Sequence, residues 1–265
     1  MALDNDPELE VAADLRARQT RLSVNLNKIA LLRNARGTGV PGVAAFARRA
    51  LEAGAGGLTA HPRPDGRHIV ADDVLELRAI VSGQPGAELN IEGRPTDDFL
   101  DLVARARPHQ CSLVPDAPGV LTSDRGWDLS REFAAVAEAV ARLKALGCRA
   151  ILFVDPSPEG LELVRDAGAD GVEIHTGRYA TAYRSGDATA ALAAVQATAA
   201  RAAALGLMVN AGHDLTTENL APLLATCRFD EVSIGHELVA DALWLGFAPT
   251  VRTYLAALNP AWEEI

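Results

Sequence analysis

The sequence predicts an α/β fold of the TIM-barrel class, a (β/α)₈ barrel with extra helices. Short β-prone runs alternate with alanine-rich helical stretches from Leu22 onward, and eight such pairs use almost all of the remaining chain. The length of 265 residues suits a single barrel of this kind. An open, doubly wound sheet is the rival architecture, but no glycine-rich dinucleotide fingerprint directly follows the first expected strand. The segment NARGTG (34–39) lacks the GK[ST] ending of a phosphate-binding P-loop.

The expected strands, in chain order, are LSVNLN (22–27), GGLTAH (56–61), ELNIEG (88–93), QCSLVP (110–115), RAILFVD (149–155), GVEIHTG (171–177), GLMVNAGH (206–213) and EVSIGH (231–236). Helices are expected near 42–53, 72–81, 96–106, 130–146, 158–167, 187–204, 217–225 and 237–257. Pro41 precedes the first helix, and Thr96, Ser130 and Thr217 are the expected N-caps. One barrel domain spanning 1–265 is therefore expected, with residues 1–20 as an N-terminal extension.

Composition and charge exclude two classes of partner. Aromatic residues make up only 5% of the chain, which argues against a surface that stacks nucleic-acid bases. The net charge of −10 argues against a duplex binder, which needs a basic face. We therefore expect no nucleic-acid partner, and any anionic substrate must be met by local positive charge.

The cysteine pattern and the N-terminus indicate the compartment. Cys111, Cys148 and Cys227 are isolated, so neither a structural zinc site nor a disulfide framework is expected. The acidic N-terminus contains no apolar stretch of signal-peptide length, and no window of the chain is apolar enough to span a bilayer. The sequence therefore predicts a cytoplasmic protein without a membrane partner.

Polar residues recur at the carboxyl ends of the expected strands. Side chains two residues apart share one face of a strand, which groups Asn25 with Asn27, Thr59 with His61, Asn90 with Glu92, and Glu173 with His175. The opposite faces are apolar and should meet the outer helices. Because burying an unpaired polar group costs about 2–7 kcal/mol, polar groups at these inward positions favour a binding or catalytic role. In this class of barrel, active sites lie at the carboxyl ends of the strands.

Histidines gather at the same end of the predicted barrel: His61, His175, His213 and His236 close strands, and His68 lies in the following loop. His109 precedes a strand at the opposite end, and we expect it to be structural. Neither HxH nor HExxH spacing occurs, so acid–base or binding roles are favoured over metal ligation.

Two carboxylates and two loops complete the candidate site. Glu92 is either a general base with a raised pKa or the ion-pair partner of an arginine, and Glu173 could stabilise a developing cation. The loops NAGHDLT (210–216) and SIGHELV (233–239) stand where such barrels often bind phosphate, and their glycines would admit it closely. Asp214 argues against an anion in the first loop unless it caps the helix. The basic residues available at this end are Lys28, Arg33, Arg36, Arg63, Arg67 and Arg178.

Seven segments together resemble the pyridoxine 5'-phosphate synthase family: VNLNKIALLRNARG (24–37), GLTAHPRPDGRHI (57–69), NIEG (90–93), LVPDAP (113–118), EIHTGRYA (173–180), VNAGHDLT (209–216) and SIGHELV (233–239). The resemblance runs in order from about Leu22 to the C-terminal helix. It implies a (β/α)₈ barrel that joins 3-amino-2-oxopropyl phosphate to 1-deoxy-D-xylulose 5-phosphate, giving pyridoxine 5'-phosphate, phosphate and water. It also implies a homo-octamer that needs no metal or organic cofactor.

The resemblance assigns roles residue by residue. His61 and Glu92 would accept protons, His213 would donate one, and Glu173 would stabilise the transition state. The amino-ketone phosphate would be held by Asn25, Arg36, Gly235 and His236, and the deoxyxylulose phosphate by Arg63, His68 and Thr122. Thr122 falls in a long loop, 116–130, which is a candidate lid.

Two departures from the family pattern leave further contacts open. Asn27 and Lys28 stand where Asp-His is commoner, and Asp214 stands where glycine is common. Substrate contacts at these three positions are therefore expected through the backbone or the side chain. Two alternatives to the family activity are a Schiff-base aldolase with Lys28 as nucleophile and a non-catalytic barrel that binds sugar phosphates.

Overall fold

The computed structural model describes residues 19–116 and 123–259, and within them eight parallel strands form a closed barrel in chain order. The strands are β1 (Arg21–Asn25), β2 (Gly57–Ala60), β3 (Glu88–Gly93), β4 (Gln110–Leu113), β5 (Arg149–Val154), β6 (Gly171–His175), β7 (Met208–Gly212) and β8 (Glu231–Ile234). Strand β8 pairs with β1 from Arg21↔Glu231 to Val24↔Ile234, which closes the ring. The predicted TIM barrel and all eight predicted strands are thus confirmed.

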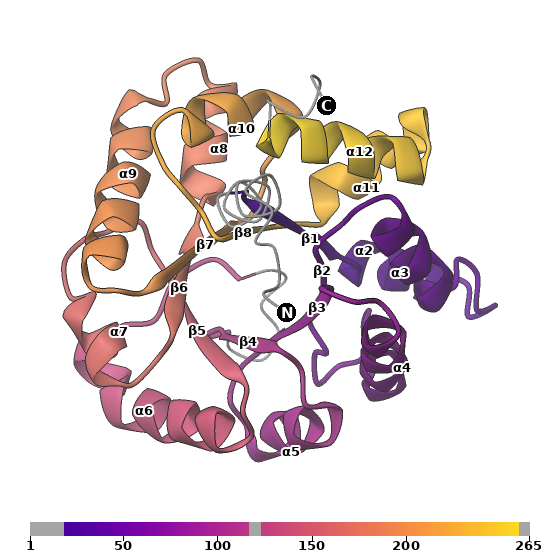
Figure 1. Ribbon diagram of the computed structural model, residues 1–265, viewed down its shortest axis with the longest axis horizontal. Coiled ribbons are helices and arrows are strands. Elements are labelled where there is room, and N and C mark those ends of the chain that lie inside the picture. The colour runs from indigo at the N-terminus through magenta and orange to yellow at the C-terminus, as the bar shows by residue number, and fades with distance from the viewer. Residues whose placement is uncertain (1–18, 117–122, 260–265) are drawn as a thin grey trace, which may run out of the picture.

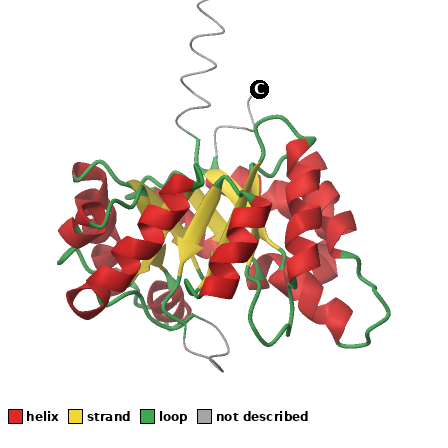
Figure 2. Ribbon diagram, turned by 90° about the horizontal axis from the view of Figure 1, so that it is seen from below, coloured by secondary structure: helices red, strands yellow, loops and turns green. Residues whose placement is uncertain are grey.

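Helices surround the barrel (Figure 1), and the side view places the strands between flanking helices (Figure 2). They are α2 (Asn27–Asn34), α3 (Val43–Glu52), α4 (Ala71–Ser82), α5 (Asp97–Ala106), α6 (Leu129–Ala145), α7 (Glu162–Asp166), α8 (Gly177–Arg184), α9 (Thr189–Ala204), α10 (Thr217–Leu224), α11 (His236–Leu245) and α12 (Phe247–Leu258). None of the helices in the described ranges has the length and apolar character that a bilayer crossing requires.

The structure corrects the helix prediction in three places. Helices α2 and α8 begin almost directly after strands β1 and β6, at positions predicted to be strand or loop. Asn27 therefore lies on a helix and does not share a strand face with Asn25. The predicted helix 237–257 is divided in two at Gly246, whose φ of 81° is left-handed and stops α11.

The helix caps agree with the prediction at one of three positions. The Thr96 side chain accepts a hydrogen bond from the N–H of Phe99 at the start of α5, as predicted. Helix α6 is capped by Asp128 instead of Ser130, and α10 by Thr216 instead of Thr217. Both differences shift the cap by one or two residues, because the side chain just outside the helix reaches the free N–H groups.

A glycine pattern that resembles a nucleotide fingerprint has an ordinary structural role. Gly37, Gly39 and Gly42 have GxGxxG spacing, but they follow helix α2 and lie in the loop before α3. A dinucleotide fingerprint requires a strand directly before it and a helix directly after its first glycines. The segment therefore gives no support to a doubly wound sheet.

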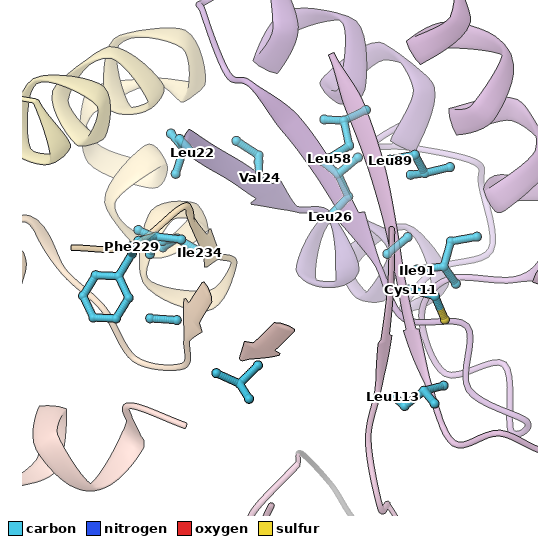
Figure 3. Close-up of a cluster of buried hydrophobic side chains, with 14 of the residues drawn as sticks. Leu22, Val24, Leu26, Leu58, Leu89, Ile91, Cys111, Leu113, Phe229 and Ile234 are labelled. Carbon is cyan, nitrogen blue, oxygen red and sulfur yellow. The ribbon is translucent and has the colours of Figure 1, made fainter. Parts of the chain in front are cut away.

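The apolar core lies between the barrel and its helices. The outward side chains of β1 to β3, among them Val24, Leu58 and Ile91, are fully buried. Figure 3 shows this layer, with Leu22 and Val24 on β1, Leu26 just after it, and Leu58 and Leu89 on the next two strands. The predicted separation of apolar outer faces from polar inner faces is confirmed, and it directs the polar groups into the barrel interior.

The amino-terminal end of the barrel is polar, and several of its side chains pair with one another or with the backbone. His109 Nδ1 accepts the N–H of Leu89 at 3.0 Å, which confirms its structural role. Gln110 donates to Glu231 at 3.2 Å and accepts from Asn210 at 3.3 Å. This end therefore holds its polar groups together across the interior.

Candidate active site

At the carboxyl ends of the strands, His61 and Glu92 form the centre of the candidate site. The His61 Nδ1 atom lies 3.7 Å from Glu92 Oε2, and both side chains are buried. Asn25 Nδ2 donates to the same carboxylate oxygen at 3.4 Å. These three residues come from the ends of β1, β2 and β3. The sequence prediction that they share one cavity is consistent with this geometry.

Glu173 approaches the centre from the other side of the barrel. Its Oε2 accepts a 2.9 Å hydrogen bond from Ser112 on β4. A Cβ at Gly212 would lie 2.5 Å from Glu173 Oε1, so the glycine leaves room for the carboxylate. The close approach gives Gly212 a clear function that the prediction of a phosphate contact did not include.

Both carboxyl groups have a raised proton affinity. Burial and then the charge of Glu173 raise the pKa of Glu92 well above its usual value. Burial also raises the pKa of Glu173, while the Ser112 hydrogen bond and His175 oppose that effect. Glu92 therefore retains a proton at a higher pH than a surface carboxyl does, which suits proton exchange near neutral pH.

His213 lies at the end of β7, with its ring against that of His175. The ring centroids are 4.8 Å apart in an edge-to-face arrangement. The backbone of His213 has a φ of 85°, and Thr176 donates to its carbonyl oxygen at 2.6 Å. Burial, together with His175 and Arg63, lowers the pKa of His213 to about 3. His213 is therefore neutral at pH 7 and would be a strong acid once protonated.

His61 is also neutral at neutral pH. Burial lowers its pKa well below the usual value, and Arg63, His68 and His213 lower it further. His61 directly follows β2 and His213 directly follows β7, so both residues lie at the carboxyl ends of the strands. The structure thus brings the four predicted acid–base residues, His61, Glu92, Glu173 and His213, to one end of the barrel.

A cavity of about 670 Å³ opens beside this centre, between the loops that follow β2 and β3. His61, Arg63, Arg67, Arg94 and Arg105 line it. Such a volume is in the range of small-molecule sites, and its lining of four arginines and three aspartates has a small excess of positive charge.

Arg63 is held by a buried carboxylate in this wall. Its Nη2 atom lies 2.5 Å from Asp116 Oδ2, and both side chains are almost inaccessible to solvent. Ser123 donates to the same Asp116 oxygen at 2.8 Å. Arg63 thus keeps a fixed place at the mouth of the cavity.

His68 is buried in the loop after β2, and its Nδ1 accepts the N–H of Ile69 at 2.9 Å. Arg33 supports the loop by donating to the His68 carbonyl at 3.1 Å and by pairing with Asp73. Burial and Arg63 lower the pKa of His68 to about 4, so it is neutral at pH 7.

The segment 24–37, the first of those that resemble the family, places its residues in three different settings. The Asn27 side chain accepts the N–H of His61 at 2.9 Å, which fixes the end of β2. Lys28 lies in the first turn of α2, and its charge contributes to the lowered pKa of His68. Arg36 is exposed in the loop after α2. Asn27 thus positions a catalytic candidate through its side chain.

The loops after β7 and β8 supply backbone at the barrel mouth. A Cβ at Gly235 would lie 3.0 Å from Asn25 Cβ, which keeps the start of α11 close to β1. His236 is exposed as the first residue of α11, a ten-residue helix whose free N–H groups favour an anion. Asp214 has a left-handed φ of 56°, and its carbonyl accepts from Asn219 at 3.0 Å. The left-handed backbone explains why glycine suits position 214.

Two predictions have no structural test, and two supporting residues were not predicted from the sequence. Thr122 lies outside the described residues, as does the part of the predicted lid from 117 to 122. Ser112 and Asp116, which hold Glu173 and Arg63, were missed as supporting residues. Ser112 pairs in register with Glu92 across β3 and β4, a signal that the alternation of polar residues contains. In residues 19–116 and 123–259, no group of three or more His, Cys, Asp or Glu side chains has an arrangement suited to a metal ion.

Solved structures share the architecture. A 3-keto-L-gulonate-6-phosphate decarboxylase from Vibrio cholerae matches with a TM-score of 0.62 at 12% identity, covering 92% of this chain and 99% of its own. A phosphoribosyl anthranilate isomerase from Thermus thermophilus matches with a TM-score of 0.53 at 18% identity, covering 91% of this chain and 100% of its own. At these identities the matches show the barrel fold alone.

Sequence relatives are much closer. A pyridoxine 5'-phosphate synthase from Brucella anthropi is 50% identical over 241 residues, which cover 90% of this chain and 98% of the relative. The corresponding protein of Brucella suis is 49% identical over the same length. The family model described as pyridoxal phosphate biosynthesis protein PdxJ matches residues 22–260. The chain therefore belongs to the PdxJ family.

Proposed function

We propose that the chain condenses 3-amino-2-oxopropyl phosphate with 1-deoxy-D-xylulose 5-phosphate, giving pyridoxine 5'-phosphate with loss of phosphate and water. Family membership and the 50% identity to a pyridoxine 5'-phosphate synthase support this reaction. The observation that carries it is the meeting of two buried carboxylates and two neutral histidines at one barrel mouth. An amine–ketone condensation with ring closure moves protons at nearly every step, and a single nucleophile could not serve them all.

We assign the proton acceptors to His61 and Glu92. His61 is neutral, so it has a free nitrogen lone pair for a proton from the substrate. Glu92 lies 3.7 Å from His61 Nδ1, close enough to exchange that proton after a small movement. Burial raises the pKa of Glu92 toward the range where a carboxyl both accepts and releases protons.

We assign proton donation to His213 and charge stabilisation to Glu173. Once His213 has taken up a proton, its low pKa makes it a strong acid toward a departing hydroxyl group. Glu173 is a buried carboxylate held by Ser112, so it can oppose the positive charge that develops on the condensing amine.

The phosphates would occupy opposite sides of this centre. Asn25, Arg36, Gly235 and His236 would hold the amino-ketone phosphate, with the first turn of α11 supplying N–H donors. Arg63, His68 and Thr122 would hold the deoxyxylulose phosphate, and the arginine-lined cavity next to Arg63 supports this side. Lys28, Asn27 and Asp214 complete the site at its rim. Holding both substrates together contributes through orientation.

The direct test mixes purified protein with both phosphates and follows pyridoxine 5'-phosphate by mass spectrometry. Product should form with one equivalent of phosphate released, and prior dialysis against EDTA should leave the rate unchanged, since we propose no metal or organic cofactor. Formation of a borohydride-trapped adduct on Lys28 without pyridoxine phosphate would instead identify an aldolase. Tight binding of both phosphates without turnover would identify a non-catalytic barrel.

We further propose that this single-domain barrel, with residues 1–20 as an extension, is a cytoplasmic homo-octamer. Exposed apolar side chains support self-association: Leu243 and Trp244 at the end of α11 are 77% and 89% exposed, and Leu31 and Leu32 on α2 are 41% and 54% exposed. Helix α2 packs against α11, so these groups belong to one side of the molecule. Such exposed apolar groups are typical of interfaces. Light scattering should give eight chains, and Trp244→Asp should lower that number.

A further inference from the structure

Two residues outside the proposed catalytic set, the buried His175 and the partly exposed Asp155, form a line of contacts that leads to His213. His175 ends β6, and Asp155 follows β5, on the adjacent strand of the barrel. The His175 Nδ1 atom lies 3.8 Å from Asp155 Oδ1. Both atoms are buried and have no hydrogen-bond partner in the described part of the chain. Because an unpaired buried polar group is costly, the mutual orientation of these two atoms calls for a reason beyond packing.

The charge of Asp155 determines which nitrogen of His175 preferably carries a hydrogen. At 3.8 Å the contact is longer than a hydrogen bond, so it acts as an electrostatic contact that a small side-chain rotation would close. Contact with His175 lowers the pKa of Asp155 despite its burial, and the backbone of Gly126 and the charge of Arg178 act in the same direction. Asp155 is thus ionised, and a carboxylate at this position favours a hydrogen on His175 Nδ1.

The opposite edge of the His175 ring is fixed by the start of α8. A Cβ at Gly177 would lie 2.7 Å from His175 Nε2, so glycine is what allows the ring to stand there. Helix α8 begins at Gly177, so its first turn starts beside this edge of the ring. The Asp155 carboxylate therefore favours hydrogen on Nδ1, and the close approach of Gly177 fixes the plane of the ring.

His175 in turn contacts the proposed proton donor. The His175 and His213 rings meet edge to face at 78°, and Phe153 packs against both rings with centroid distances of 5.2 Å. The residue after His175 holds the backbone, since Thr176 Oγ1 donates to the carbonyl oxygens of Gly212 and His213. The end of β6 thus determines both the backbone position and the ring plane of His213.

The charged and titratable neighbours do not offer His213 another support of this kind. His61 and Arg63 face it across the cavity and, like His175, disfavour a positive charge on its ring. Glu173 interacts with His175 from the same strand, and Arg178 interacts with Asp155 from α8. Among these groups, Asp155 is the carboxylate that approaches His175 Nδ1.

We propose that Asp155 and His175 are positioning residues for His213: the Asp155 carboxylate fixes the tautomer and plane of His175, and the His175 ring fixes the plane of His213. The inference rests on the proposed function for the role of His213 as proton donor. It adds a second line of residues, behind the four that would meet substrate.

The central variant is Asp155→Asn, which keeps the shape of the side chain and removes its charge. We expect kcat for pyridoxine 5'-phosphate formation to fall about 10- to 100-fold while KM for both substrates changes less than about twofold, the range expected for coupled neighbouring residues. His175→Asn should have a similar effect, because an amide nitrogen replaces Nδ1 but the ring against His213 is lost. The matched control is Asp166→Asn, which removes an exposed carboxylate on α7 and should leave kcat unchanged.

A double mutant separates positioning from general damage. His213→Asn alone should lower kcat strongly, and adding Asp155→Asn should lower it no further, because Asp155 would act only through His213. Multiplicative losses in the double mutant would overturn the proposal. If Asp155→Asn lowers both the thermal midpoint and kcat, the same double-mutant comparison is made with His175→Asn in place of Asp155→Asn. Multiplicative losses in that double mutant would likewise overturn the proposal.

A second readout does not depend on activity. Long-range ¹H–¹⁵N spectra of the histidine rings should show His175 with hydrogen on Nδ1 in the unmodified protein, and a mixture of tautomers in Asp155→Asn. An unchanged His175 tautomer together with an unchanged kcat would overturn the inference. Absence of pyridoxine phosphate with the unmodified protein would count against the proposed function, while the ring spectra would still decide on the Asp155–His175 pair.

Discussion

Strand β3 carries one glutamate at each end, and the two ends of the barrel treat them in opposite ways. Glu88, at the start of the strand, meets Arg21 at 3.1 Å and pairs with Arg149. Burial would raise its pKa, but the Arg149 hydrogen bonds and the charge of Arg21 lower it overall. Glu92, near the end of the same strand, meets only an amide and a neutral imidazole at 3.4 and 3.7 Å.

The difference is one of partners, since both residues are glutamates on one strand. A carboxylate between two guanidinium groups is held as an anion and contributes to stability. A carboxyl facing a neutral ring and a second carboxylate retains its proton and is ready for transfer. The barrel therefore holds Glu88 as a paired anion at one end and keeps Glu92 ready for proton transfer at the other.

Glu92→Gln should separate the two ends most clearly. The amide keeps the size of the side chain but cannot accept a proton, so kcat should fall about 10²- to 10⁴-fold. The free energy of unfolding should not fall, because no strong partner is lost and the amide removes the cost of ionising a buried carboxyl. Product formation and a urea titration measure the two quantities. A rate near that of the unmodified protein would remove Glu92 from the mechanism.

Glu88→Gln should give the converse result. Its loss leaves Arg21 and Arg149 without their carboxylate, and we expect the free energy of unfolding to fall by about 1–3 kcal/mol, the range for hydrogen bonds to charged groups. At 25 °C kcat should stay near that of the unmodified protein. The loss should diminish as the pH drops through the lowered pKa of Glu88, because a protonated Glu88 no longer pairs in the unmodified protein. A large loss of kcat in a stable variant would contradict the division between the two ends.

Glu231→Gln tests a buried carboxyl at the structural end that has no arginine pair. Burial raises its pKa to about 7, so the unmodified protein loses stability as the pH rises from the unfolded value through about 7. Glutamine removes this loss and can keep the contact with Gln110. The variant should therefore gain about 1–3 kcal/mol over the unmodified protein at pH 8.5 and little at pH 4.5, where Glu231 is still protonated in the folded state. Urea unfolding at the two pH values measures it, and a pH-independent difference would refute the explanation.

Ser112→Ala should have the smallest effect. It removes the hydrogen bond to Glu173, a contact of about 0.5–1.5 kcal/mol, and further raises the pKa of that carboxyl. We expect kcat to fall about two- to tenfold with KM unchanged. Steady-state kinetics at pH 7 and 8.5 should show a smaller deficit at the higher pH, where Glu173 is again ionised. An unchanged kcat at both pH values would mean that the bond only supports the fold.

The sequence predicted most of this arrangement because strand alternation is a local property. Residues two apart on a strand share a face, so the inward positions of His61, Glu92 and Glu173 followed from spacing alone. Helix starts were harder to predict: Asn27 reads as the end of a strand, yet its N–H is accepted by the Asn25 side chain at 2.9 Å where α2 begins. That bond depends on a turn which the polar–apolar pattern does not encode.

Contacts between distant residues could not be predicted at all. Arg63 and Asp116 are 53 positions apart, and no periodicity relates them. The same holds for Ser112 and Glu173, which the barrel brings together across its interior. His175 was identified as an inward residue at a strand end, but its relation to Asp155 depends on the register of two strands.

The missing side chain at Gly212 links two distant positions of the sequence. A methyl group there would occupy the place of the Glu173 carboxylate. Any protein of this fold in which the equivalent of Gly212 has gained a side chain should therefore also have lost, or redirected, the acid at the equivalent of Glu173. Comparing the positions equivalent to Gly212 and Glu173 would therefore distinguish barrels that retain this chemistry from related barrels that have lost it.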